Sequence, residues 1–93
     1  MKELTIFYLE GCPYCRKARA AIEELKSVNP GFGKVTVRWI EETLSPEIAN
    51  RYDYYRVPSI FFGDEKLYEC SPGDDYSEIR RQAERALTAA AGK

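Results

Sequence analysis

Two cysteines separated by two residues are the side chains in this sequence best suited to chemistry. The segment Cys12-Pro13-Tyr14-Cys15 follows an apolar run at residues 4–9 and precedes an alanine-rich segment. A cysteine at the junction of a strand and a helix can occupy the helix N-terminus, where unpaired N–H groups and the helix dipole stabilise an anion. Because the thiolate is the nucleophilic form, we predict that Cys12 is the attacking sulfur of a redox-active dithiol.

The three residues after Cys12 suit this role. Pro13 fits the first helical position, where its missing N–H costs nothing and its restricted φ matches the helix. Cys15 lies one turn later on the same face, so its sulfur can close a small disulfide with Cys12, and we assign it as the resolving thiol. Tyr14 is predicted to shield the sulfurs and shape the substrate groove, with an exposed loop aromatic that makes no specific contact as the alternative.

Other uses of a Cys-x-x-Cys pair are disfavoured by three cysteines and no histidine. A structural zinc site normally takes four Cys or His ligands, so a site within one monomer would have to recruit carboxylates. A structural disulfide over so few residues would constrain little of the unfolded chain. We therefore expect no metal and no tightly bound cofactor. Cys70 is predicted to be a small apolar strand residue, with a regulatory or glutathionylated thiol as the alternative.

Length and composition predict one domain over residues 1–93, since 44% hydrophobic residues are enough for one core. Fourteen basic against 15 acidic residues give a net charge of −1, so we expect no nucleic-acid or membrane partner. We find no signal-peptide pattern and no apolar run that could span a bilayer. We therefore expect a cytoplasmic monomer, and in that reducing setting a Cys-x-x-Cys pair is more often catalytic than structural.

The elements that must position the dithiol follow from hydrophobic periodicity and turn signals. These patterns predict strands at residues 4–9, 35–39, 60–62 and 66–70, and helices from Pro13 to just before Asn29, from Ser45 to about residues 51–53, and from Asp74 or Asp75 through Ala90. The order βαβαββα indicates an α/β fold with a four-stranded mixed sheet flanked by helices. Chemistry in such sheets collects at the carboxyl ends of the parallel strands, which is where Cys12 emerges.

The sequence resembles the glutaredoxin family of the thioredoxin-fold superfamily. Cys12-Pro13-Tyr14-Cys15 has the residue types of the glutaredoxin active site, and Val57-Pro58 resembles the family's Thr-Val-Pro segment, whose proline is cis. The resemblance covers nearly the whole chain and implies a thioredoxin-like fold. It also implies that Pro58 faces the disulfide and that the backbone of Val57 pairs with an extended substrate. Gly73-Asp74-Asp75 resembles the end of the segment that holds the γ-glutamyl end of glutathione on a helix N-terminus.

Departures from the family pattern fall on the glutathione site. Many glutaredoxins carry a cation shortly before the first cysteine, whereas Glu10 would repel a glutathione carboxylate. Arg56 replaces the threonine before Val-Pro, and Tyr54 and Tyr55 occupy places where the family often has Gln and Arg. A contact to a glutathione carboxylate would therefore have to come from Arg56 or Arg51. Pro72 stands where a glycine is usual and removes one backbone donor.

The resemblance implies a thiol-disulfide oxidoreductase that reduces glutathione mixed disulfides or protein disulfides through Cys12 and Cys15, with glutathione as a candidate co-substrate. One alternative is a protein disulfide reductase that receives electrons from a flavoprotein reductase of the thioredoxin-reductase type. A second is a non-catalytic redox sensor or partner-binding module with the same fold. The electron donor, the reduction potential and the physiological substrate stay open.

Overall fold

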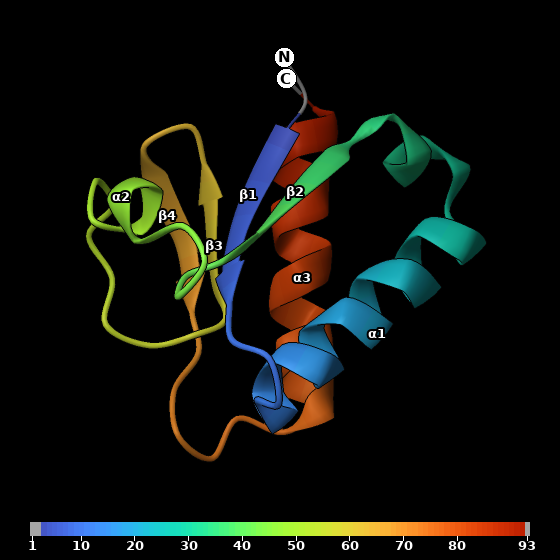
Figure 1. The fold of residues 1–93 in the computed structure, drawn as a ribbon. Coiled ribbons are helices and arrows are strands. Elements are labelled where there is room, and N and C mark those ends of the chain that lie inside the picture. Colours follow the sequence, from blue (N-terminus) through green and yellow to red (C-terminus); the bar gives the residue numbers. More distant parts are fainter. Residues whose placement is uncertain (1–2, 93) are drawn as a thin grey trace.

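The computed structural model describes residues 3–92 and arranges the strands in one mixed four-stranded sheet (Figure 1). The elements in chain order are β1 (Glu3–Tyr8), α1 (Pro13–Val28), the 3-10 helix η1 (Pro30–Lys34), β2 (Thr36–Glu41), α2 (Pro46–Ala49), β3 (Ser59–Phe62), β4 (Glu65–Glu69) and α3 (Tyr76–Ala91). The predicted order βαβαββα and the α/β class are confirmed, with η1 as an addition.

The sheet has the order β2-β1-β3-β4, so β1 lies between two neighbours and β2 lies at an edge. β1 runs parallel to β2 and antiparallel to β3. Parallel strands need a long connection, and α1 provides it. β3 and β4 form the predicted hairpin, which turns at Gly63 with a φ of 61°. Because β1 is paired on both sides, the chain leaves the sheet from a well-anchored strand just before Cys12.

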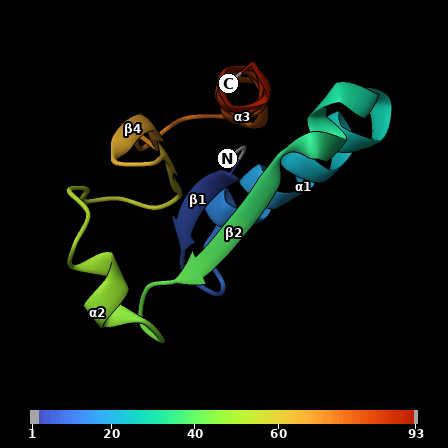
Figure 2. The ribbon, with the colours of Figure 1, turned by 90° about the horizontal axis from the view of Figure 1, so that it is seen from above.

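The two faces of the sheet are covered by different helices (Figures 1 and 2). α1 and α3 pack side by side on one face, while the short α2 lies on the other. Successive side chains of a strand point to opposite faces, so Ile6 of β1 faces α1 and α3 while Phe7 faces α2. The amphipathic pattern that predicted the two long helices therefore corresponds to their shared packing face.

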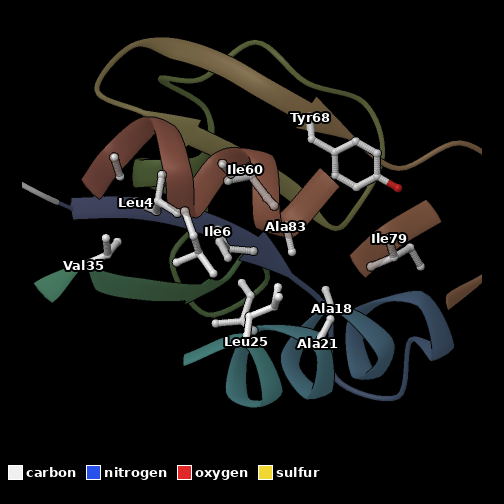
Figure 3. Packing of buried hydrophobic residues seen from close by; sticks show 14 of the residues in the cluster. Leu4, Ile6, Ala18, Ala21, Leu25, Val35, Ile60, Tyr68, Ile79 and Ala83 are labelled. Carbon is white, nitrogen blue, oxygen red and sulfur yellow. The ribbon is translucent and has the colours of Figure 1, made fainter. Parts of the chain in front are cut away.

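The main core lies between the sheet and the pair α1 and α3 (Figure 3). Its buried residues include Leu4, Ile6, Ala18, Ala21, Leu25, Val35, Ile60, Ile79 and Ala83. Alanines contribute from both helices, and small side chains at a helix contact permit a short interaxial distance. This packing anchors both helix N-termini at the end of the sheet where the chain leaves β1.

The opposite face is covered mainly by aromatic side chains from the segment that follows α2. The rings of Tyr52 and Tyr54 lie 4.7 Å and 4.8 Å from the ring of Phe7, centroid to centroid. Tyr55, the next residue, projects away and is 89% exposed. The segment that leads to Val57-Pro58 is thus anchored on the sheet by two tyrosines before it reaches the site.

Two predicted boundaries differ from the structure by about two residues: α2 ends at Ala49 rather than near residues 51–53, and β2 continues to Glu41 rather than ending at residue 39. After α2, the N–H groups of Arg51 and Tyr52 still donate to the carbonyls of Ile48 and Ala49, so the helix tightens into turns before Tyr52 packs on the sheet. Within residues 3–92, no helix has the length and apolar character that crossing a bilayer requires.

A core substitution tests this packing. We expect Ile6→Ala to lower the free energy of unfolding by roughly 2–5 kcal/mol, because Ile6 is fully buried in the strand paired on both sides. Leu44→Ala is the matched control, since Leu44 is 79% exposed and its truncation should change that free energy by less than about 0.5 kcal/mol. Urea unfolding of both variants measures the difference, and equal losses would contradict this description of the core.

Candidate redox site

Cys12 is the N-cap residue of α1, at the position that the sequence predicts. Its backbone is extended (φ −79°, ψ 120°), Pro13 begins the helix, and the Cys12 carbonyl accepts a hydrogen bond from the N–H of Arg16 at 3.0 Å. Gly11 makes the turn that precedes it with a φ of 79°, in the left-handed region that favours glycine. The Cys12 side chain is partly exposed. A sulfur that a substrate can reach therefore lies at the helix terminus that stabilises an anion.

Cys15 lies one turn along α1 and is only 5% exposed. Burial raises the pKa of the Cys15 thiol to about 12. A hydrogen bond with the backbone of Leu9 lowers this pKa, whereas the hydrogen bond and the charge of the neighbouring Cys12 raise it. Cys15 is thus a neutral, shielded thiol near neutral pH, in contact with the more exposed sulfur.

Cys70 is the third free thiol and belongs to the main core cluster. It follows β4, is 3% exposed, and its N–H donates to the Pro58 carbonyl at 3.0 Å. Burial raises the pKa of the Cys70 thiol, a hydrogen bond with Tyr68 lowers it, and the charge of Cys12 raises it. Its burial fits the predicted small apolar residue, and its backbone ties the end of β4 to the loop that carries Pro58.

The loop before β3 lines a groove together with Tyr14, the residue that separates Pro13 from Cys15. The Val57–Pro58 peptide bond is cis, as the resemblance implied, and Pro58 is fully buried. A groove of about 290 Å³ lies beside this loop. Tyr14, Arg56 and Val57 line it together with Cys70 and Pro72. The groove brings together residues from the start of α1, from the loop before β3 and from the segment after β4.

The segment that the resemblance assigns to glutathione is already hydrogen-bonded within the protein. The N–H of Gly73 donates to the Tyr14 hydroxyl at 3.1 Å. Asp74 Oδ2 accepts from the Tyr68 hydroxyl at 2.6 Å and from the N–H of Ser71 at 3.0 Å. Asp75 Oδ1 accepts from the N–H of Glu78 at 2.9 Å, which caps α3.

These contacts give Tyr14 a specific partner, in contrast to the exposed loop aromatic that was its alternative. They also place Asp74 and Asp75 in structural roles at the start of α3. A hydrogen bond from Tyr68 holds the pKa of Asp74 below its usual range, so this carboxylate stays charged near neutral pH.

The residues that departed from the family pattern lie at the surface. Glu10, Arg51 and Arg56 are all exposed. Arg56 lines the groove, while Arg51 precedes the tyrosines that cover the sheet. Among residues 3–92, no three His, Cys, Asp or Glu side chains form a group that could hold a metal ion.

One residue of this region was not anticipated from the sequence. Glu69 Oε2 accepts hydrogen bonds from the N–H groups of Tyr55 and Arg56, 14 and 13 residues earlier in the chain. A glutamate near the end of a predicted strand carries no signal that distinguishes it from a solvated charge, so only the fold reveals this contact.

The chain matches the family model described as Glutaredoxin over residues 4–67. This range includes Cys12, Cys15 and Val57-Pro58, whereas the segment from Gly73 to Asp75 lies beyond it. None of the curated proteins compared with the chain matches it.

Solved structures of two thioredoxins resemble this fold. One is a mutant thioredoxin from Halobacterium salinarum NRC-1, with a TM-score of 0.58 and 21% identity over 91% of this chain and 74% of that chain. The other is thioredoxin 1 from the thermophilic eubacterium Thermosipho africanus TCF52B, with a TM-score of 0.56 and 16% identity over 94% of this chain and 96% of that chain. At these identities the likeness shows the fold, and the predicted thioredoxin-like fold is confirmed. Since the family model covers well over half of the sequence, the chain belongs to the glutaredoxin family.

Proposed function

We propose that this protein is a dithiol thiol-disulfide oxidoreductase of glutaredoxin type, which reduces protein disulfides or glutathione mixed disulfides through Cys12 and Cys15. The observation that carries the proposal is the difference between the environments of the two cysteines. Cys12 is partly exposed at a helix N-terminus, whereas Cys15 is buried beside it with a pKa of about 12. Membership of the glutaredoxin family supports thiol-disulfide oxidoreductase activity in general.

The reaction starts at the accessible sulfur. The Cys12 thiolate attacks one sulfur of the substrate disulfide, which forms a mixed disulfide and releases the other substrate sulfur as a thiolate. Cys15 then gives up its proton and attacks the Cys12 sulfur, which forms the Cys12–Cys15 disulfide and releases the second substrate sulfur as a thiol. Two electrons have then passed to the substrate, and an external thiol donor must reduce the pair again.

The environment of Cys15 supports this order of events. Its hydrogen bond with Cys12 and the Cys12 charge both raise the pKa of Cys15. When Cys12 is bonded to a substrate sulfur, it carries neither a thiol proton nor a negative charge. The pKa of Cys15 then falls, so the resolving thiol becomes reactive only after the first step.

The loop before β3 is the proposed substrate platform. Pro58 and Val57 follow Arg56 in the segment that borders the groove, and Tyr14 lines its other side. Among residues 3–92, neither the N–H nor the C=O of Val57 makes a hydrogen bond. An extended substrate segment can pair with these groups as an added strand does with a sheet edge.

The segment after β4 favours protein disulfides over glutathione mixed disulfides. The N–H of Gly73 already donates to the Tyr14 hydroxyl, so its recognition of a γ-glutamyl carboxylate would compete with that bond, and Asp74 and Asp75 each already use one carboxylate oxygen within the protein. These bonds support a flavoprotein reductase as the alternative to glutathione as the electron donor. We propose that residues 1–93 act as one monomeric domain without a tightly bound cofactor, in a reducing compartment such as the cytoplasm.

Turnover by single-cysteine variants tests the proposed function. One assay follows a small glutathione mixed disulfide with glutathione, glutathione reductase and NADPH, and a second follows insulin disulfides with dithiothreitol. We expect the wild-type protein to be active on insulin disulfides and Cys12→Ser to be inactive in both assays, because Cys12 makes the first bond. Cys15→Ser should lose the insulin reaction while retaining any monothiol turnover of the glutathione substrate.

Cys70→Ser is the matched control, because it also removes one buried thiol yet should keep both activities. A Cys12→Ser protein with full activity would contradict the mechanism. An inactive wild-type protein in both assays and with a flavoprotein reductase would favour the redox-sensor alternative.

The pH dependence of alkylation tests the roles of the thiols. A raised pKa keeps a thiol protonated and unreactive through neutral pH, so iodoacetamide should label Cys12 of the reduced protein and leave Cys15 unlabelled until strongly alkaline pH. In Cys12→Ala, the onset of Cys15 labelling should move to lower pH, because two contributions that raise its pKa are removed. Peptide mass spectrometry measures each site.

Cys70→Ala is the control for this shift, since Cys70 makes the smallest of the contributions to the pKa of Cys15. Equal labelling rates of Cys12 and Cys15 at neutral pH would contradict the assignment of attacking and resolving thiols.

A further inference from the structure

We propose that Glu69 is a positioning residue for the substrate platform: its carboxylate holds residues 55–56 so that the backbone of Val57 is presented to an extended disulfide substrate. This inference rests on the proposed function, because it assigns a role within the same site. Glu69 acts through its hydrogen bonds to the loop and not through contact with a reacting sulfur.

The contact is made by a single oxygen atom of Glu69. Glu69 Oε2 accepts from the N–H of Tyr55 at 2.7 Å and from the N–H of Arg56 at 2.6 Å. Hydrogen bonds to an ionised acceptor are about twice as strong as neutral ones. Two consecutive amides bound to one carboxylate oxygen define the direction in which the chain enters Val57.

Glu69 is itself held in place. It ends β4, where it pairs with Ser59 across the hairpin, and its other oxygen accepts from Lys66 Nζ at 2.7 Å. The side chain is 18% exposed. Burial alone would raise the pKa of Glu69, but the hydrogen bonds from Lys66, Tyr55 and Arg56 hold that pKa below its usual range. The acceptor therefore stays charged at neutral pH.

Val57 differs from its two neighbours in the loop by the hydrogen bonding of its backbone. The Arg56 carbonyl accepts from the Ser59 hydroxyl, and the Pro58 carbonyl accepts from the N–H of Cys70 at 3.0 Å. Both neighbours of Val57 are thus bonded to the protein, whereas its own N–H and C=O bond to no group within residues 3–92. Because the residues before and after Val57 are both hydrogen-bonded to the protein, the loop presents the unbonded N–H and C=O of Val57 in a single orientation.

Loss of the Glu69 carboxylate would leave the N–H groups of Tyr55 and Arg56 without their acceptor. The loop would then have to be ordered again each time a substrate binds, and ordering lowers affinity. Cys12 lies on α1 and makes no contact with Glu69 in the hydrogen bonds described, so its intrinsic reactivity should not change. The expected defect is in substrate positioning.

Three variants test the role of Glu69 in the full-length protein, with insulin disulfides and dithiothreitol as the assay. Glu69→Ala should lower kcat/KM roughly tenfold, mainly through a higher KM, while iodoacetamide modifies Cys12 at the wild-type rate. Glu69→Gln should recover part of the loss, because its amide oxygen can still accept from both N–H groups. Lys66→Met is the matched control, because it removes the ion pair, leaves both loop bonds, and should stay within twofold of wild type.

Amide hydrogen exchange adds a readout that is independent of turnover. In Glu69→Ala we expect faster exchange at Tyr55 and Arg56, with unchanged exchange at Ile60 in the centre of β3. If Glu69→Ala itself does not fold, Glu69→Gln still reports on the same two amides, because a neutral acceptor should protect them less than the carboxylate does.

The outcomes separate this inference from the proposed function. A wild-type protein without disulfide reductase activity would overturn the function, and unchanged exchange at Tyr55 and Arg56 in Glu69→Ala would overturn the positioning role. An active wild-type protein with unchanged kcat/KM in Glu69→Ala would also overturn that role. So would a Lys66→Met defect as large as that of Glu69→Ala, or a slower alkylation of Cys12 in proportion to the loss of turnover.

Discussion

The placement of one sulfur at the N-terminus of α1, a helix packed on the sheet by one face, is the constraint on which the rest of the site depends. β1 is paired on both sides, and α1 packs against both the sheet and α3, so the junction between β1 and α1 cannot shift without disturbing the core. Gly11 provides the positive φ that turns the chain, and Pro13 begins the helix. Cys12 is therefore held partly exposed at the N-cap of α1, and the same geometry buries Cys15 one turn later.

Two segments distant in the sequence then complete the site. The loop that ends at Pro58 is tied to the end of β4 through Cys70 and Glu69. The segment after β4 is tied to α1 through the hydrogen bond between Gly73 and Tyr14. The site is thus held together by hydrogen bonds between its walls, and within residues 56–58 of the platform the backbone left open is that of Val57.

The sequence predicted the elements of this fold better than the contacts between them. The bounds of α1 could be predicted because Pro13 and Asn29 mark its ends, and the hairpin because a turn that begins at Gly63 separates two short strand patterns. The end of α2 was missed by about two residues because turn-type hydrogen bonds replace helical ones at residues 51–52, a change that the sequence pattern does not mark. The bond between Gly73 and Tyr14 joins residues 59 positions apart, and the contacts of Glu69 depend on strand pairing, so neither has a local signal. The internal bonds of Asp74 likewise follow from the neighbouring Tyr68, which no motif includes.

The role of Cys12 as the attacking sulfur is tested most directly by trapping the covalent intermediate. The Cys15→Ser protein is mixed with a disulfide-bonded peptide, quenched with acid, and mapped by mass spectrometry without reduction. We expect a mixed disulfide on Cys12, formed with the release of one peptide thiol and stable because the resolving thiol is missing. A mixed disulfide on Cys70, or no adduct while the reduced wild-type protein still reduces the peptide, would contradict it.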